Sequence, residues 1–161
     1  MTITVEREQI DNGGDDGSRL NGVARQVLNG WTTGRILKKS ESGALVIFNT
    51  AAGQSITLPA IASRDLGMYF DFLVTVTGTG TYGIATSDAG TFIIGGVDSS
   101  STTVAEGGDT FAAAGSEVAI LFDGDTTGRL VGTSIRLTAI STTQWAVSGT
   151  IMGVGTLATP F

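Results

Sequence analysis

The residues best suited to chemistry in this chain are oxygen ligands in one acidic loop. Asp123 and Asp125 are separated by one glycine and followed by the hydroxyls of Thr126 and Thr127. Two carboxylates at this spacing can bind Ca²⁺. The twelfth position counted from Asp123 is Ser134, where a full EF-hand loop has a bidentate glutamate. Because Asp-Gly is also a strong hairpin signal, the sequence favours a polar turn, and we predict no metal and no cofactor.

Two residue types on which common catalytic sites depend are absent from the sequence. The chain contains no His and no Cys. This excludes Ser–His–Asp triads, thiol nucleophiles, disulfides and zinc sites built from His or Cys. The 15 acidic residues are scattered over expected turns, so no carboxylate pair of the kind used by glycosidases is identifiable. We therefore expect a protein that is not an enzyme.

Basic residues are concentrated in the first quarter of the chain. Residues 1–42 hold six of the nine Lys and Arg residues and six acids, whereas residues 43–161 hold three bases and nine acids. The net charge of −6 therefore belongs to the later part. An acidic body disfavours nucleic acid, whose binding depends on Lys and Arg contacts to phosphate. The early part supplies the candidate contacts with an acidic partner, with one tryptophan as an apolar anchor: Arg19, Arg25, Trp31, Arg35, Lys38 and Lys39.

The elements that must position these residues are β-strands. Glycine accounts for 24 of the 161 residues, and threonine is equally common. Glycine destabilises helix interiors, and threonine suits a pleated strand better than a helix. Hydrophobic residues make up 41% of the chain, which is enough for a core. The composition predicts an all-β domain.

Alternation of polar and apolar residues marks the expected strands. The strongest runs from Met68 to Thr77 and places Asp71 on the exposed face. We expect a hairpin between 35–38 and 44–49, one helical turn within 60–66, and a buried Trp145. The remaining expected strands are short and separated by turns: 55–58, 81–85, 91–94, 102–105, 110–113, 117–122, 129–131, 134–140 and 144–148. Many short strands of this kind are typical of a sandwich or barrel.

The N-terminal region differs from the rest. Residues 11–18 are rich in Asp, Asn and Gly and read as a loop. We predict an arm or loosely packed segment over residues 1–33 and a β-sandwich domain over 34–161. The N-terminus lacks the apolar stretch of a signal peptide, and no run approaches the length of a membrane span. We therefore expect no membrane association and synthesis in the cytoplasm.

Short motifs in the later part of the chain resemble those of a known class of proteins. The stretch Gln54–Ala60 with Gly67–Phe72, together with Gln144–Gly149 and the ending Thr159–Phe161, is similar to motifs in small β-rich virion proteins of tailed bacteriophages. The resemblance covers about residues 45–161. It implies capsid decoration (cement) proteins or head-fibre and tail-fibre modules, commonly homotrimers of jelly-roll-like antiparallel β-sandwich type.

Two functions follow from this resemblance, and a third reading is left open. The leading hypothesis is a decoration protein that binds the major capsid protein on the outer surface of a phage head through residues 1–33 and the basic residues named above. The alternative is a tail-fibre or lectin-like module that binds glycans near Tyr82 with Asp88, or near the Asp123–Asp125 loop. A scaffold in a cellular surface layer is the third reading, although the missing signal peptide counts against it.

Overall fold

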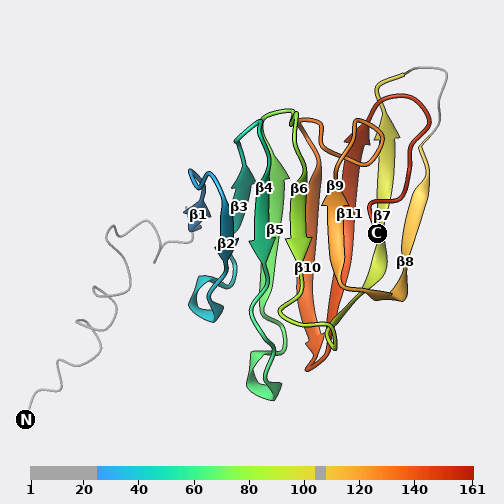
Figure 1. The fold of residues 1–161 in the computed structure, drawn as a ribbon. Helices are drawn as coiled ribbons and strands as arrows, with labels where there is room; N and C mark the ends of the chain where they lie inside the picture. The colour runs from blue at the N-terminus through green and yellow to red at the C-terminus, as the bar shows by residue number, and fades with distance from the viewer. Residues whose placement is uncertain (1–24, 104–107) are drawn as a thin grey trace, which may run out of the picture.

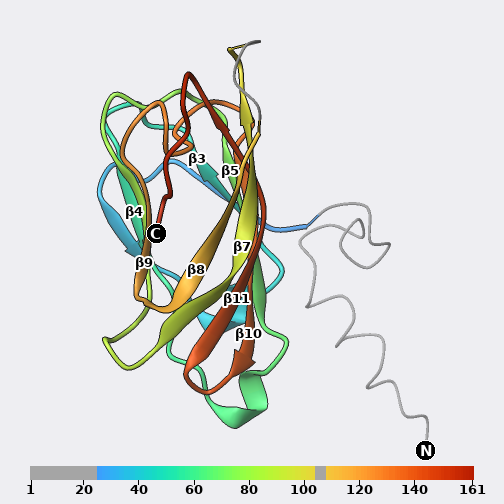
Figure 2. The same ribbon diagram turned by 90° about the vertical axis from the view of Figure 1, so that its right-hand side faces the viewer.

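The structure is a computed structural model that describes residues 25–103 and 108–161. The chain forms two stacked β-sheets, seen face-on in Figure 1 and edge-on in Figure 2. The two longest helical elements described are single 3₁₀ turns, η1 (Lys39–Glu41) and η2 (Ser63–Asp65). The prediction of an all-β fold is confirmed, and the helical turn expected within 60–66 is present as η2.

Seven strands form one sheet and four form the other. The seven-stranded sheet has the order β1-β3-β5-β10-β11-β7-β8. Its strands are β1 (Val27–Leu28), β3 (Leu45–Phe48), β5 (Tyr69–Val74), β7 (Phe92–Ser101), β8 (Thr110–Glu117), β10 (Ser134–Ser141) and β11 (Gln144–Gly153). The four-stranded sheet has the order β2-β4-β6-β9. Its strands are β2 (Gly34–Ile36), β4 (Gln54–Thr57), β6 (Tyr82–Ala85) and β9 (Ala119–Phe122).

The first six strands alternate between the two sheets. As a result β1, β3 and β5 are parallel neighbours in one layer, and β2, β4 and β6 are parallel neighbours in the other. Strands β7 and β11 are also parallel, so five of the nine strand pairs among the described residues are parallel. The expected antiparallel sandwich is therefore wrong in this respect, because alternation along a strand fixes its buried face but not the direction of its neighbour.

Two expected hairpins are also absent from the described part of the chain. The segments 35–38 and 44–49 belong to different sheets, since β2 pairs with β4 while β3 pairs with β1 and β5. The Asp123–Asp125 loop likewise connects β9 of one sheet to β10 of the other. The strand expected at 129–131 is a turn in the structure. Local turn signals were correct here, but the chain crosses between layers where a hairpin was predicted.

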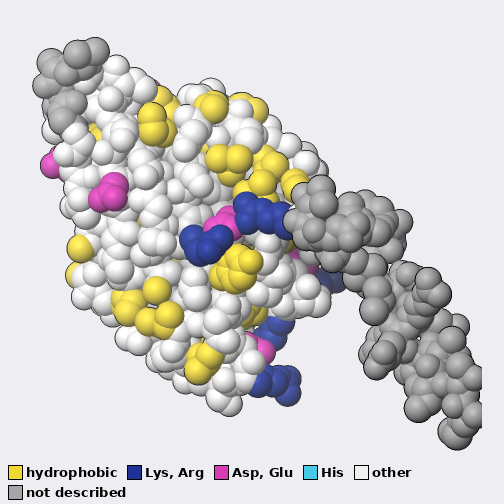
Figure 3. All heavy atoms as spheres, turned by 180° about the vertical axis from the view of Figure 1, so that it is seen from behind, with side chains coloured by type: hydrophobic (Ala, Val, Ile, Leu, Met, Phe, Trp, Pro, Cys, Tyr) yellow, Lys and Arg dark blue, Asp and Glu magenta, His cyan; other side chains and the backbone are white. Residues whose placement is uncertain are grey.

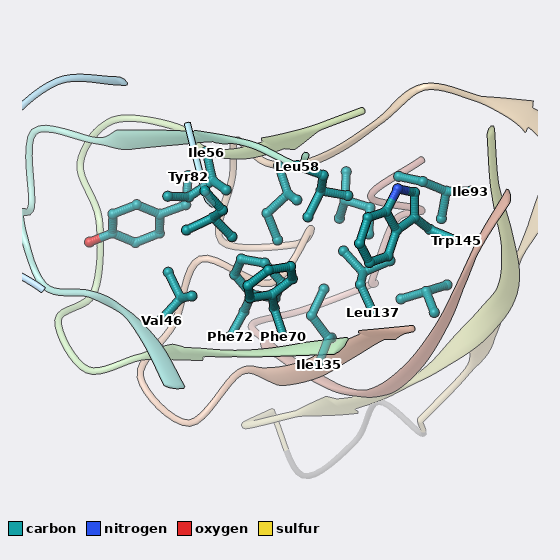
Figure 4. Close-up of a cluster of buried hydrophobic side chains, with 14 of the residues drawn as sticks. Val46, Ile56, Leu58, Phe70, Phe72, Tyr82, Ile93, Ile135, Leu137 and Trp145 are labelled. Atoms are coloured by element: carbon teal, nitrogen blue, oxygen red, sulfur yellow. The ribbon is translucent and has the colours of Figure 1, made fainter. Parts of the chain in front are cut away.

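The core lies between the two sheets. Figure 4 shows Tyr82, Phe72, Phe70 and Trp145 in a row through this layer. All four side chains are almost completely buried. The Phe70 and Trp145 rings lie 6.1 Å apart, and the Tyr82 ring stacks on Phe48 at 5.0 Å. The expected burial of Trp145 is confirmed.

Part of the expected arm belongs to the sandwich. Strand β1 pairs with β3 at the edge of the seven-stranded sheet, and Leu28 is buried in the core. Trp31 packs edge-on against Phe48, with ring centroids 6.4 Å apart. The folded body thus begins before residue 34, and the structure does not describe residues 1–24.

Candidate interaction surface

One ionic cluster lies at the centre of the outer face of the seven-stranded sheet. Strand pairing places Asp71 of β5 beside Arg136 of β10. The two Asp71 carboxylate oxygens accept hydrogen bonds from Nε and Nη2 of Arg136 at 2.7 and 2.8 Å. A third hydrogen bond comes from Arg25, which precedes β1. The Asp71 side chain is only 13% exposed, so the predicted exposure of this residue is wrong.

The cluster carries a net charge of +1 and is held in a fixed geometry. Two guanidinium groups share one carboxylate, and such bidentate arginine pairs are among the strongest hydrogen-bonded ion pairs. The Arg136 guanidinium also lies 4.6 Å from the centre of the Tyr69 ring, a cation–π contact. Hydrogen bonding from Arg136 and then from Arg25 lowers the pKa of the Asp71 carboxyl, against the opposing effect of burial. The carboxylate is therefore charged at neutral pH.

A second ionic cluster is formed where the two 3₁₀ turns approach each other. Lys39 of η1 pairs with Asp65 of η2, and Arg35 of β2 pairs with Glu41. Arg64 lies 3.9 Å from Asp65, and its side chain is 86% exposed. Lys39 lowers the pKa of Asp65 through a hydrogen bond, helped by the backbone N–H of Ala62. This corner presents Lys39 and Arg64 to solvent.

Five of the six predicted contact residues lie at one end of the sandwich. Arg25 precedes β1, Trp31 and Arg35 are near or in β2, and Lys38 and Lys39 follow β2. Lys38 is exposed and makes no ion pair within the described residues. Arg19 lies outside the described residues.

Trp31 is not the exposed anchor that the sequence suggested. Its ring is partly buried against the core, and the Arg35 guanidinium lies 6.0 Å from its centre. Its carbonyl oxygen accepts a hydrogen bond of 2.7 Å from the Gln54 amide. Its indole N–H has no hydrogen-bond partner in the structure. Trp31 therefore closes one end of the core and is not a free contact.

Charge is divided between the two ends of the body. The end with β1, β2, η1 and η2, together with the Asp71 cluster, carries six Lys and Arg and three acids, a net charge of +3. Counting described residues only, the end with β7, β8 and β9 carries six acids and Arg129, a net charge of −5. In Figure 3 the Lys and Arg side chains lie in the centre and right of the outer face of the seven-stranded sheet. Acidic side chains lie toward its opposite edge.

The residues on which the glycan-binding and calcium-binding hypotheses depend are bound to their own neighbours in the fold. Tyr82 is fully buried, and its hydroxyl donates a 2.7 Å hydrogen bond to the Val76 carbonyl oxygen, so it does not provide the exposed aromatic ring that the glycan-binding alternative requires. Asp88 accepts hydrogen bonds from the Gly90 backbone and the Thr91 hydroxyl. In the 123–129 loop Asp125 pairs with Arg129, and the Thr127 hydroxyl donates to Asp123. No group of three or more candidate metal ligands occurs within residues 25–103 and 108–161.

Sequence reasoning missed Arg136 and Arg64 as contributors to the basic end. Arg136 lies on the polar face of an alternating strand, and this signal was visible. Its pairing with Asp71 depends on the register between β5 and β10, which are far apart in the sequence. Arg64 joins the first group of bases only because η1 and η2 meet in the fold.

Comparison with known proteins identifies no relative. No protein-family model, curated protein or solved structure matches the chain. Over the described residues, no helix is both long and apolar enough to span a membrane.

Proposed function

We propose that this protein is a non-enzymatic virion structural protein, a capsid decoration (cement) protein that binds the outer surface of a phage head and stabilises it. The observation that carries the proposal is the gathering of basic side chains at one end of an otherwise acidic body. A protein that docks on an acidic shell needs a basic contact surface and an acidic remainder directed outward. The partner is the major capsid protein.

The docking surface consists of the Asp71 cluster and the corner formed by η1 and η2. Arg25 and Arg136 are held by Asp71, so little conformational entropy is lost when they meet a carboxylate on the shell. Lys39 and Arg64 extend the surface at the same end. Exposed charges are screened over about 10 Å at 0.1 M salt, so the binding is expected to weaken as salt is raised.

The test has two parts. Quantitative mass spectrometry of purified virions should find the chain in a simple ratio to the major capsid protein. Heads lacking the protein should then bind the purified chain, and Arg25→Ala and Arg64→Ala should each weaken this binding by about threefold to tenfold. Arg129→Ala is the matched control, because it removes the same charge at the acidic end.

Two outcomes contradict the proposal. A handful of copies per virion would move the protein to a tail or fibre. Equal losses from Arg129→Ala and Arg64→Ala would show that net charge matters and that this surface does not. The homotrimer and the jelly-roll likeness implied by the resemblance stay predictions. The glycan-binding alternative gains no support from the positions of Tyr82 and Asp88.

A further inference from the structure

The outer face of the four-stranded sheet is free of charge. Strand registers align two rows across it. The rows are Ile36–Thr57–Ala85–Ala119 and Gly34–Ser55–Gly83–Leu121. None of these eight residues is ionisable, although the chain has 24 charged residues. Six of them are small, and the two large ones, Ile36 and Leu121, occupy diagonally opposite corners.

The two large side chains of this face are open to solvent. Ile36 is 72% exposed and Leu121 is 46% exposed. Covering this face with a partner would remove the two large apolar side chains from water without desolvating a charged group. A groove of about 440 Å³ borders it on the β9 side. Ala119 and Leu121 of β9 line this groove, together with Glu117 at the end of β8, Asp123 after β9 and the C-terminal Phe161.

We propose that this face packs against the same face of a second copy of the chain, about a two-fold axis parallel to the strands. Such an axis places β2 of one copy over β9 of the other and keeps each row aligned. Ile36 then lies opposite Ala119, and Leu121 opposite Gly34, so each large side chain meets a small one. An axis across the strands would instead stack β2 on β2 and bring like charges together.

Charge complementarity supports this orientation. The row that contains Ile36 continues to Lys38, whose backbone is extended, and on the β9 side it continues to Glu117. The pairing therefore brings Lys38 of each copy to Glu117 of the other. Neither Lys38 nor Glu117 makes an ion pair within the described residues, and the Glu117 carboxylate accepts hydrogen bonds from the Gly115 and Ser116 backbone.

This inference does not depend on the proposed function, because it concerns the purified chain alone. It replaces the homotrimer implied by the phage resemblance with a two-fold pair. It reassigns Lys38 from the capsid surface to the contact between copies. The surface proposed for capsid binding, on the opposite sheet and at the η1–η2 corner, remains free in the pair.

Sedimentation equilibrium of the full chain at low salt tests the proposal. The wild type should have the mass of a dimer. Ile36→Asp and Leu121→Asp should each weaken association at least about tenfold, because each places two unpaired carboxylates in an apolar contact. Val131→Asp is the matched control, since Val131 is 53% exposed in the loop between β9 and β10. Thermal unfolding should show that all three variants remain folded.

Crosslinking tests the register. The chain has no cysteine, so introduced thiols are unique. A short bismaleimide should link copies of the double variant Ile36→Cys/Ala119→Cys into covalent dimers. Ile36→Cys alone should give none, since the two Ile36 residues of a pair lie about 14 Å apart across the sheet.

A wild type that remains monomeric throughout the micromolar range overturns the proposal, as does a dimer that Ile36→Asp leaves intact. Efficient crosslinking of Ile36→Cys alone would also overturn it. The mass of a trimer would reject the two-fold pairing and agree with the phage resemblance.

Discussion

Asp71 connects parts of the chain that are distant in sequence. Its carboxylate accepts hydrogen bonds from Arg136, 65 residues later, and from Arg25, 46 residues earlier. Replacing it leaves two guanidinium groups adjacent without a shared anion. Because both arginines are partly solvated, the penalty is smaller than for a fully buried pair.

We expect Asp71→Asn to lower the free energy of unfolding by about 1–2 kcal/mol, since it removes charge-assisted hydrogen bonds. Urea unfolding followed by tryptophan fluorescence measures this change. Asp109 is exposed, and its carboxylate has no hydrogen-bond or ion-pair partner within the described residues, so Asp109→Asn should change stability by less than about 0.5 kcal/mol. Equal effects of the two substitutions would show that the cluster contributes nothing to stability.

Lowering the pH should remove the stabilisation that the Asp71 cluster provides. Hydrogen bonding from Arg136 lowers the pKa of Asp71 in the folded state, so the unfolded chain takes up the proton more readily. The stabilisation is complete above the unfolded-state pKa and is lost as pH falls through the lower, folded-state pKa. Thermal unfolding from neutral pH to about pH 2 should therefore show the wild type and Asp71→Asn converging in acid. A constant difference in melting temperature across this range would argue against the shift.

For single residues, the sequence predicted which positions carry charge or an aromatic ring but did not predict which residues they contact. Asp71 was recognisable as a charge within an apolar strand, and Arg136 as part of a polar face. That they meet depends on strand register between segments far apart in the chain. Trp31 was misjudged because its neighbours in sequence are polar, whereas its contact with Phe48 is a tertiary one.

Strand β11 contains a glycine that the sheet requires. Gly149 has φ 138°, and a Cβ there would lie 2.3 Å from the Ser134 carbonyl oxygen of β10. We expect Gly149→Ala to destabilise the protein by at least about 2 kcal/mol, since it adds both backbone strain and a clash. Chemical unfolding measures the loss.

Gly124→Ala provides the comparison for that substitution. A Cβ at Gly124 would make only ordinary contacts, the nearest at 3.7 Å. The change should cost less than about 1 kcal/mol. Similar losses at both positions would mean that the two strands adjust to a side chain at Gly149.

Elements were easier to predict than their arrangement. Strands β4, β5, β6, β10 and β11 fall within or beside the segments marked by alternation, because each has one buried face. Strands β7 and β8 are longer than expected, and their glycines and small residues hid the pattern. Parallel pairing leaves no local sequence signal of the kind that a tight hairpin turn provides.

At the scale of the whole molecule, the boundary of the folded body can be tested by truncation. Deleting residues 1–24 should leave the sandwich folded, because residues 25–103 and 108–161 already form two stacked sheets around a core. Deleting residues 1–33 should lower the free energy of unfolding by about 3 kcal/mol or more, because it removes buried Leu28 and the packing of Trp31. Melting temperatures of the two truncated chains check this. Equal stability would restore the boundary at residue 34 that the sequence suggested.

The division of charge also belongs to this scale. Composition shows only a net charge of −6, and the sequence shows bases enriched before residue 43. The fold converts that enrichment into a polarity of the body, since Arg64 and Arg136 join the early bases while the later acids gather around β7, β8 and β9. A protein with this polarity orients in the field of a charged partner before contact.

The alternation of the first six strands between the layers makes this half of the molecule a coil of three turns. Each turn adds one strand to each of the two sheets, beside the strand of the previous turn. In the seven-stranded sheet, neighbouring positions on successive turns are 18 residues apart (Val27 and Leu45) and then 26 residues apart (Leu45 and Asp71). Unequal turns explain why the sequence has no fixed repeat. They also place the β1–β2 turn at the end of the coil, where a turn can be added or removed without changing the connections of the β7–β11 half. We expect evolution or design to change the width of this protein there, in steps of one turn, where new side chains replace the packing of Leu28 and Trp31.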